Sequence, residues 1–268
     1  MLTRFVDNQA SYCLAVLFSG MLAACASTRP TPLPITLIDL TYPLDHETVY
    51  WPHNAPFTWE RTDWGMTAGG YWYASAKFSA SEHGGTHMDA PIHFGQGRHT
   101  VDQIPVERLV APAVVLDVRP QCDRNSDYEV TTDDILAWEA KNGRIPPGTI
   151  ALIHTGWGRH WPDRQRYLGS RTPDDASTLH FPGVSQAAAL FLVKDRAVNG
   201  LGIDTASIDP GQSRDFPVHR VLGEANVYAL ENVAALERLP ATGATLWALP
   251  IKIRGGTGGP VRLIATVP

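Results

Sequence analysis

The apolar residues of this chain occur in short runs separated by turn residues, a pattern typical of a protein rich in strands. Residues 71–79 alternate between aromatic and small side chains with the period of two expected for a strand. Residues 110–118 form a strongly β-branched apolar run and residues 149–154 form another, so both are predicted to be buried strands. Further strands are expected at residues 35–40, 197–203, 227–230 and 244–253.

Two helices are predicted from residues that cap helix N-termini. Thr131 and the acidic residues after it precede a helix that runs to about Lys141 and ends at Asn142-Gly143. Ser185 precedes an alanine-rich helix over residues 186–194. Many strands with few helices favour an α+β fold, or a layered β/β/α arrangement, in a single domain, because no internal repeat or linker divides the chain.

The first 34 residues are predicted to lie outside this domain. Arg4 leads into an apolar stretch over residues 13–24 that is too short to cross a bilayer, as expected for a secretory signal. The stretch ends in LAAC, which resembles the bacterial lipobox, so residues 1–25 are interpreted as a signal peptide and Cys25 as a lipidated residue. Cleavage without lipidation and a misassigned start codon are the alternatives.

Residues 26–34 are rich in Ser, Thr and Pro and are predicted to be a flexible tether to a domain over residues 35–268. The protein is therefore expected to be exported and periplasmic, with a lipid anchor in the membrane. Once the signal is removed, Cys122 is the only remaining thiol, so the domain is expected to fold without an intrachain disulfide.

The composition is that of an ordinary globular protein, with 44% hydrophobic and 18% charged residues. The formal net charge of −5 gives no electrostatic case for nucleic-acid binding. Ten histidines are many for this length, and their clustering along the chain carries more information than their number.

The densest group of chemically active side chains lies in residues 83–93, which read HGGTHMDAPIH. The segment holds three imidazoles and a carboxylate, the side chains best suited to a divalent ion such as Zn or Mn. Its glycines and proline disfavour a regular helix, so a compact irregular loop is expected. His83, His87 and Asp89 are the candidate ligands of one ion. The alternative interpretation is that they cap turns.

The string SEHGGTHMDAPIHF resembles the signature H-x-G-T-H-x-D-x-P-x-H of the cyclase family of metal-dependent hydrolases, which includes kynurenine formamidase (arylformamidase) and isatin hydrolase. The similarity continues through IDLTYPLDHETVYWP, VDQIPVERL, LIHTGW and GIDTASIDPG, and so covers the chain from about residue 35 to its C-terminus. The last of these strings is more similar to isatin hydrolase-like members. The resemblance implies a swivelling β/β/α fold that assembles as a homodimer or homotetramer.

The resemblance also implies roles for particular residues. It makes His83, His87 and Asp89 the ligands of the first metal and His93 the catalytic acid/base, an imidazole expected to titrate near neutral pH. It implies a second metal held by His219 and Glu231, which stand twelve residues apart, with Asp89 as the bridge between the two ions. Occupancy by one ion, as in isatin hydrolase-like members, is the alternative.

Weaker candidates lie elsewhere in the chain. The resemblance places Trp51 over the substrate pocket, although core packing is the ordinary use of a tryptophan. Asp204, Ser207 and Asp209 follow a predicted strand and are candidates for orienting the ligands, with turn capping as the alternative.

The sequence therefore predicts an exported hydrolase, with one or two Zn or Mn ions per subunit, that cleaves an amide C–N bond of a small aromatic substrate. N-formyl-kynurenine-like formamides and cyclic amides such as isatin are the two substrate types that the resemblance implies. Two alternatives stay open: a non-catalytic periplasmic lipoprotein that binds metal or ligand, and a lyase or cyclase that acts on a related small molecule.

Overall fold

The computed structural model describes residues 35–267, which belong to one compact unit. The predicted signal peptide, the tether and the lipidated Cys25 lie outside the described residues. Within residues 35–267, no helix is both long and apolar enough to span a membrane.

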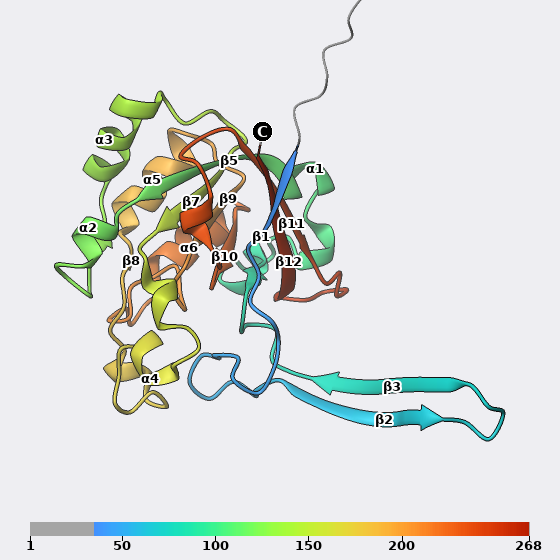
Figure 1. Cartoon of the computed structure of the whole chain (residues 1–268). Coiled ribbons are helices and arrows are strands. Elements are labelled where there is room, and N and C mark those ends of the chain that lie inside the picture. Colours follow the sequence, from blue (N-terminus) through green and yellow to red (C-terminus); the bar gives the residue numbers. More distant parts are fainter. Residues whose placement is uncertain (1–34, 268) are drawn as a thin grey trace, which may run out of the picture. The chain divides into compact units, whose positions relative to one another are not determined.

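Figure 1 shows the arrangement of the helices and strands. The strands are β1 (Thr36–Asp39), β2 (Thr58–Met66), β3 (Trp72–Ser79), β4 (His87–Asp89), β5 (Val110–Asp117), β6 (Glu129–Val130), β7 (Ile150–His154), β8 (Gly183–Val184), β9 (Gly200–Ile203), β10 (Tyr228–Glu231), β11 (Ala244–Pro250) and β12 (Gly258–Val267). The helices are α1 (Val106–Leu109), α2 (Arg119–Cys122), α3 (Thr132–Asn142), α4 (Arg164–Tyr167), α5 (Gln186–Lys194) and α6 (Pro217–Glu224).

The main sheet closes on itself as a seven-stranded barrel. Its strands follow the order β12-β11-β5-β7-β9-β10-β4, and β4 also pairs with β12 to complete the ring. β5, β7, β9 and β10 run parallel, the other pairs are antiparallel, and β1 extends the sheet beyond β12. The structure confirms a single domain of mixed strands and helices. It does not confirm the layered β/β/α description, because the main sheet forms a closed ring.

The barrel strands bury side chains on both faces. In β7, Ile150 and Leu152 belong to the core inside the barrel, whereas Ala151 and Ile153 pack outside it against helices α3, α5 and α6. The sequence of a strand that is buried on both faces is a continuous apolar run, rather than an alternation of apolar and polar residues. This two-sided burial explains why residues 110–118 and 149–154 could be recognised as strands from the sequence.

Several elements differ from the prediction. Residues 83–93 were expected to be an irregular loop, but they contain the buried strand β4 and a 3-10 helix, η1 (Pro91–His93). Strand β2 and helix α6 were not predicted, and residues 258–267, which begin in a glycine-rich run, form the long strand β12. β2 and β3 pair only as a two-stranded arm that runs out from the barrel (Figure 1).

Candidate metal centre

The strand that closes the barrel carries two of the predicted ligands, His87 and Asp89. They are two residues apart on one strand, so their side chains point to the same face. The neighbouring strand β10 ends in Glu231, which lies directly opposite His87 in the antiparallel register. All three side chains are buried. The pairing of β4 with β10 therefore brings together residues that are far apart in the sequence.

Three imidazoles reach the same point from other elements: His83 precedes β4, His93 ends η1 and His219 lies in the first turn of α6. The start of α6 is held by Asp209, whose carboxylate accepts hydrogen bonds from the backbone N–H groups of Val218 and His219 at 2.9 and 3.1 Å. The same carboxylate lies 2.6 Å from Nδ1 of His219. Asp209 therefore both caps the helix and orients the imidazole.

Asp89 lies at the centre of the cluster. Its Oδ1 is 2.6 Å from Nδ1 of His83 and 3.2 Å from Nε2 of His87. Its Oδ2 is 3.1 Å from Nε2 of His219. One carboxylate thus faces three imidazoles with its two oxygens, which is the arrangement that a bridging ligand requires.

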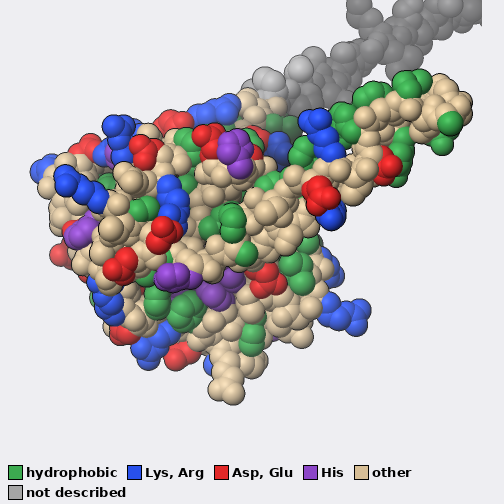
Figure 2. All heavy atoms as spheres, turned by 90° about the horizontal axis from the view of Figure 1, so that it is seen from below, with side chains coloured by type: hydrophobic (Ala, Val, Ile, Leu, Met, Phe, Trp, Pro, Cys, Tyr) green, Lys and Arg blue, Asp and Glu red, His purple; other side chains and the backbone are tan. Residues whose placement is uncertain are grey.

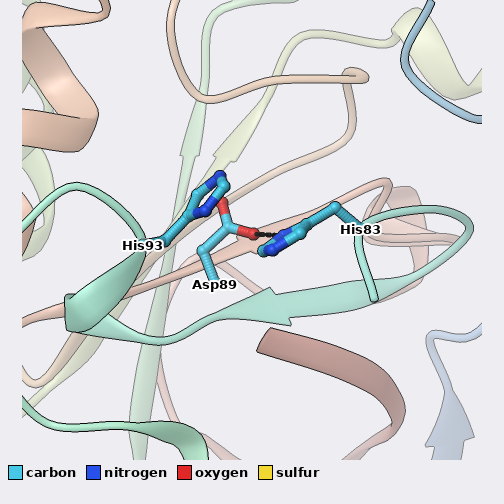
Figure 3. A group of neighbouring side chains, drawn as sticks. All are labelled: His83, Asp89 and His93. Atoms are coloured by element: carbon cyan, nitrogen blue, oxygen red, sulfur yellow. Dashed lines mark hydrogen bonds and ion pairs between the residues drawn. The ribbon is translucent and has the colours of Figure 1, made fainter. Parts of the chain in front are cut away.

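The potential ligand atoms form two overlapping groups, in each of which they lie within 4.8 Å of one another. One group is His83, Asp89 and His93, and the other is His87, Asp89 and Glu231. Figure 3 shows the first group, with the imidazoles of His83 and His93 beside the Asp89 carboxylate. These two rings are stacked, with centroids 3.9 Å apart. The structure thus brings together the six residues that were predicted to bind metal or to act as the acid/base. The two groups differ from the predicted ligand sets, which placed His83 and His87 with Asp89 at one ion, and His219 and Glu231 with Asp89 at the other.

The chemistry of this donor set fits a divalent cation. Nδ1 of His87 lies 2.9 Å from the carbonyl oxygen of Gly85 and must donate to it, so Nε2 is the ring nitrogen left to bind an ion once it has lost its proton. That Nε2 is buried and has no hydrogen-bond partner. The carboxylates of Asp89 and Glu231 are also buried, and buried carboxylates require nearby positive charge. A cation held among them would satisfy both the imidazole nitrogen and the carboxylates.

The pKa of His93 is shifted in the opposite direction from the pKa values of His87 and His219. Burial alone lowers the pKa of His87, but the Asp89 and Glu231 carboxylates outweigh it and raise the pKa to about 9. For His219, hydrogen bonds that its ring donates to the carboxylates of Asp209 and Asp89 likewise outweigh burial and hold its pKa well above the usual value. Burial dominates at His93 and lowers its pKa to about 4, against the opposing charge of Asp89. His93 is therefore a neutral imidazole near pH 7, rather than one that titrates there as the sequence predicted.

The cluster forms the polar side of a cavity of about 230 Å³. The predicted pocket residue Trp51 lines it, together with Phe94 and Phe216, and the Trp51 and Phe216 rings meet edge to face with centroids 6.0 Å apart. Ser207 also lines the cavity, and its hydroxyl oxygen accepts a hydrogen bond from the backbone N–H of Asp209. The cavity is thus aromatic on one side and ionic on the other.

Asp204 lies apart from this cluster. Its carboxylate accepts hydrogen bonds from the backbone and hydroxyl of Thr155 and from the backbone N–H of Gly156, at 2.6 to 2.9 Å, and so holds that turn. The cavity residues that were not singled out from the sequence include Phe94, Phe216, Tyr50 and Asn232. Asn232 follows Glu231 directly, and that position next to a predicted ligand was the only signal available.

A model of the Cyclase family, described as "Putative cyclase", matches residues 38–210, a span that contains His83, His87, Asp89 and His93. The chain belongs to this family. An isatin hydrolase of Roseibium aggregatum is 36% identical over 195 residues, which cover 70% of this chain and 72% of the relative. A kynurenine formamidase of Bacillus cereus is 27% identical over 231 residues, covering 85% of this chain and 95% of the relative. The structure of isatin hydrolase A from Ralstonia solanacearum superposes with a TM-score of 0.81 at 36% identity, over 90% of this chain and 99% of that one.

Metal binding by this cyclase-family protein is expected to release protons. Because the pKa of His87 in the metal-free cluster is raised to about 9, its Nε2 is protonated at pH 7 and must lose that proton to bind an ion. The apparent affinity for Zn should therefore fall as the pH is lowered from 9, by roughly tenfold per unit for each proton released. Calorimetric titrations at pH 7 in buffers of different ionisation enthalpy count these protons. Binding without proton release would contradict the expectation.

Asp209→Asn is expected to weaken metal binding by about 10- to 100-fold, because the variant loses the carboxylate that orients His219. Competition with a chromophoric chelator measures the affinity. The matched control is Asp215→Asn, which changes a carboxylate whose side chain is 75% exposed and should leave the affinity unchanged. Equal affinity in the two variants would show that Asp209 does not support the site.

Proposed function

We propose that this protein is a metal-dependent hydrolase that cleaves an amide C–N bond of a small aromatic substrate. The observation that carries the proposal is the cavity itself, in which an aromatic wall stands opposite buried imidazoles and carboxylates. Its relatives named isatin hydrolase and kynurenine formamidase support the reaction type. Cyclic amides such as isatin and formamides such as N-formyl-kynurenine are the two substrate types we propose to test.

The ions we propose are Zn or Mn, one or two per subunit. Ligation by nitrogen and carboxylate oxygen without thiolate suits both metals. His83, His87, Asp89, His219 and Glu231 would hold them, with Asp89 shared. An ion bound there would lower the pKa of a water molecule and polarise the substrate carbonyl group.

His93 is the residue we propose to move protons. Because burial lowers its pKa to about 4, the imidazole is neutral near pH 7 and free to accept a proton from the attacking water. The same low pKa makes the imidazolium a strong acid, which favours return of the proton to the departing amide nitrogen. Stacking on His83 holds the ring against the ligand cluster.

Two other functions make different predictions for the products. A protein that only binds metal or ligand would produce none, and it would have no need for an imidazole placed as His93 is. A lyase or cyclase that closes a ring by dehydration would lose water, whereas hydrolysis adds it. The mass of the product therefore separates the three functions.

His93→Ala is expected to lower kcat by about 10²- to 10⁴-fold, because the variant lacks the proton acceptor and donor. Its metal content should equal that of the wild type. The control is His180→Ala, which removes an imidazole that is 48% exposed and pairs with Asp127. Unchanged turnover in the metal-replete His93 variant would remove His93 from the reaction, and loss of the metal would make it a ligand instead.

We also propose that the protein assembles as a homodimer or homotetramer through the β2–β3 arm. The register of the arm places Trp59, Trp64, Met66, Trp72 and Phe78 on one face, where they are 49% to 66% exposed. Figure 2 shows hydrophobic side chains along this arm, at the upper right of the view. A two-stranded hairpin is only marginally stable alone, so an apolar face of this kind needs a covering surface.

The apolar area that the arm exposes is large enough to form a dimer interface of typical size. Five side chains that each expose roughly 100 Å² give about 500 Å² per arm. Two arms and the surfaces that they cover would bury about 2,000 Å² in a twofold dimer, which is typical of a stable interface. The opposite face of the arm carries the Glu60–Lys77 ion pair, with N and O atoms 2.9 Å apart, and is suited to water.

Substitution of both Trp64 and Trp72 by Lys is expected to dissociate the oligomer, because it places two charges in the proposed interface. Sedimentation equilibrium at micromolar concentrations measures the mass. Tyr73→Lys is the matched control, since it changes an aromatic residue on the opposite face of the same strand. A monomeric wild type, or equal association in the double variant, would contradict the proposal.

Export to the periplasm and a lipid anchor at Cys25 complete the proposal. Only the N-terminal sequence supports them, through its apolar stretch and the LAAC motif. An exported enzyme would act on an external compound rather than in cytoplasmic tryptophan breakdown.

A further inference from the structure

The glycine-rich run at residues 255–259 lies against the predicted ligand His83. Strand β12 begins in this run and pairs with β4 in a register that places Gly258 opposite Asp89. A Cβ atom on Gly258 would lie only 2.7 Å from Cε1 of the His83 ring, so a glycine is needed for the backbone to approach the imidazole this closely. The run therefore forms one wall of the space in which His83 lies.

Thr257, inside this run, contacts the segment that carries the ligands. Its hydroxyl oxygen lies 2.9 Å from Nε2 of His83. The hydroxyl donates a hydrogen bond to Oε2 of Glu82, and the backbone N–H of Thr257 donates to the same oxygen at 3.0 Å. The carbonyl oxygen of Thr257 accepts from the backbone N–H of Ala90 at 2.9 Å. One residue thus holds the ligand segment on both sides of β4.

These contacts determine which nitrogen of His83 faces the cluster. A hydroxyl group has one hydrogen, and Thr257 donates it to Glu82. The hydroxyl oxygen can then only accept from His83, so Nε2 of the imidazole carries a proton and is the donor. Nδ1 lies 2.6 Å from Oδ1 of Asp89 (Figure 3) and is the ring nitrogen left to bind an ion.

His83 is held differently from the other two imidazoles of the predicted ligand set. Nδ1 of His87 donates to a backbone carbonyl oxygen, and Nδ1 of His219 lies 2.6 Å from a carboxylate, so both of these rings present Nε2 to the cluster. His83 presents Nδ1 instead, and its outer nitrogen reaches the carboxylate of Glu82 only through the hydroxyl of Thr257. Outer partners of this kind fix the orientation of a metal-binding imidazole.

We infer that Thr257 and Glu82 are positioning residues of the metal centre, which hold Nε2 of His83 so that Nδ1 binds the ion. Thr257 supplies the hydrogen-bond acceptor, and Glu82 orients the hydroxyl by accepting its hydrogen. Without the hydroxyl, the Nε2–H group would lose its partner and the ring its fixed orientation. The ring of His93, which stacks on His83 with centroids 3.9 Å apart, would lose that support as well. Their role rests on the proposed function, which requires an ion at this site.

Thr257→Val keeps the size of the side chain without the hydroxyl, and it is expected to weaken Zn binding by about 10- to 100-fold. Thr257→Ser keeps the hydroxyl and should restore the affinity to within about threefold of the wild type. Glu82→Gln can still accept the hydrogen but lacks the charge, so the loss should be about tenfold. Competition between the purified full chain and a chromophoric chelator measures each affinity.

The matched control is Thr266→Val, which makes the same change near the other end of β12. The hydroxyl of Thr266 donates to the backbone carbonyl oxygen of Thr245 and does not contact the cluster. Its loss should leave the affinity for Zn unchanged.

Nitrogen NMR of the histidine rings gives a readout that a change in packing alone would not move. In the Zn-loaded wild type, His83 should carry its proton on Nε2 and the ion on Nδ1, the reverse of His87 and His219. In Thr257→Val, the Nε2–H of His83 should exchange rapidly with water, because it has lost its acceptor. The Nδ1–H signals of the other two rings should persist.

Zn bound through Nε2 of His83 in the wild type would overturn the inference without any variant. An unchanged affinity in Thr257→Val would also overturn it, as would a loss that Thr257→Ser does not restore. If Thr257→Val does not fold, the wild-type spectrum and the affinity of Glu82→Gln decide. All of these outcomes leave the metal centre standing, whereas a wild type that binds no ion would overturn the proposed function and the positioning role with it.

Discussion

The barrel and the candidate site both depend on the placement of the Asp89 carboxylate. The three residues of β4 close the ring by pairing with β10 on one side and β12 on the other. The same pairing buries Asp89 among His83, His87 and His219. A buried carboxylate is costly unless positive charge compensates it, and imidazoles with a divalent ion provide that compensation. Closing the barrel and assembling the ligands are therefore one structural event.

The parts of the site that lie close together in the chain were predictable from the sequence. His87 and Asp89 share a strand, and His83 and His93 flank it within a few residues, so their composition alone indicated a metal site. The contact with Glu231 depends on the register between β4 and β10. No local pattern encodes such a register, and only the family resemblance pointed to His219 and Glu231 as partners.

The elements that the sequence missed have physical reasons. Helix α6 begins at Pro217 after Phe216, which adopts a left-handed conformation, and its N-terminus is capped from a distance by Asp209. The usual local capping signal is therefore missing. Strand β2 mixes aromatic and charged residues because one face of the arm is apolar and the other is polar. Strands of the barrel wall were recognisable because burial on both faces makes them continuously apolar.

The proposed reaction depends on unequal environments in one cavity. Carboxylates keep His87 and His219 cationic in the absence of an ion, which would replace their protons, whereas burial keeps His93 neutral near pH 7, as the proposed proton transfer requires. The aromatic wall of Trp51, Phe94 and Phe216 then favours a flat substrate beside these groups.

Elemental analysis of the purified protein, followed by turnover of isatin and N-formyl-kynurenine by the same sample, tests whether the cluster around Asp89 is a catalytic metal centre. We expect one or two equivalents of Zn or Mn per chain and hydrolysis of at least one compound, abolished by a chelator and restored by the metal. A folded, metal-replete preparation that binds no ion, or hydrolysis that a chelator does not affect, would contradict this expectation.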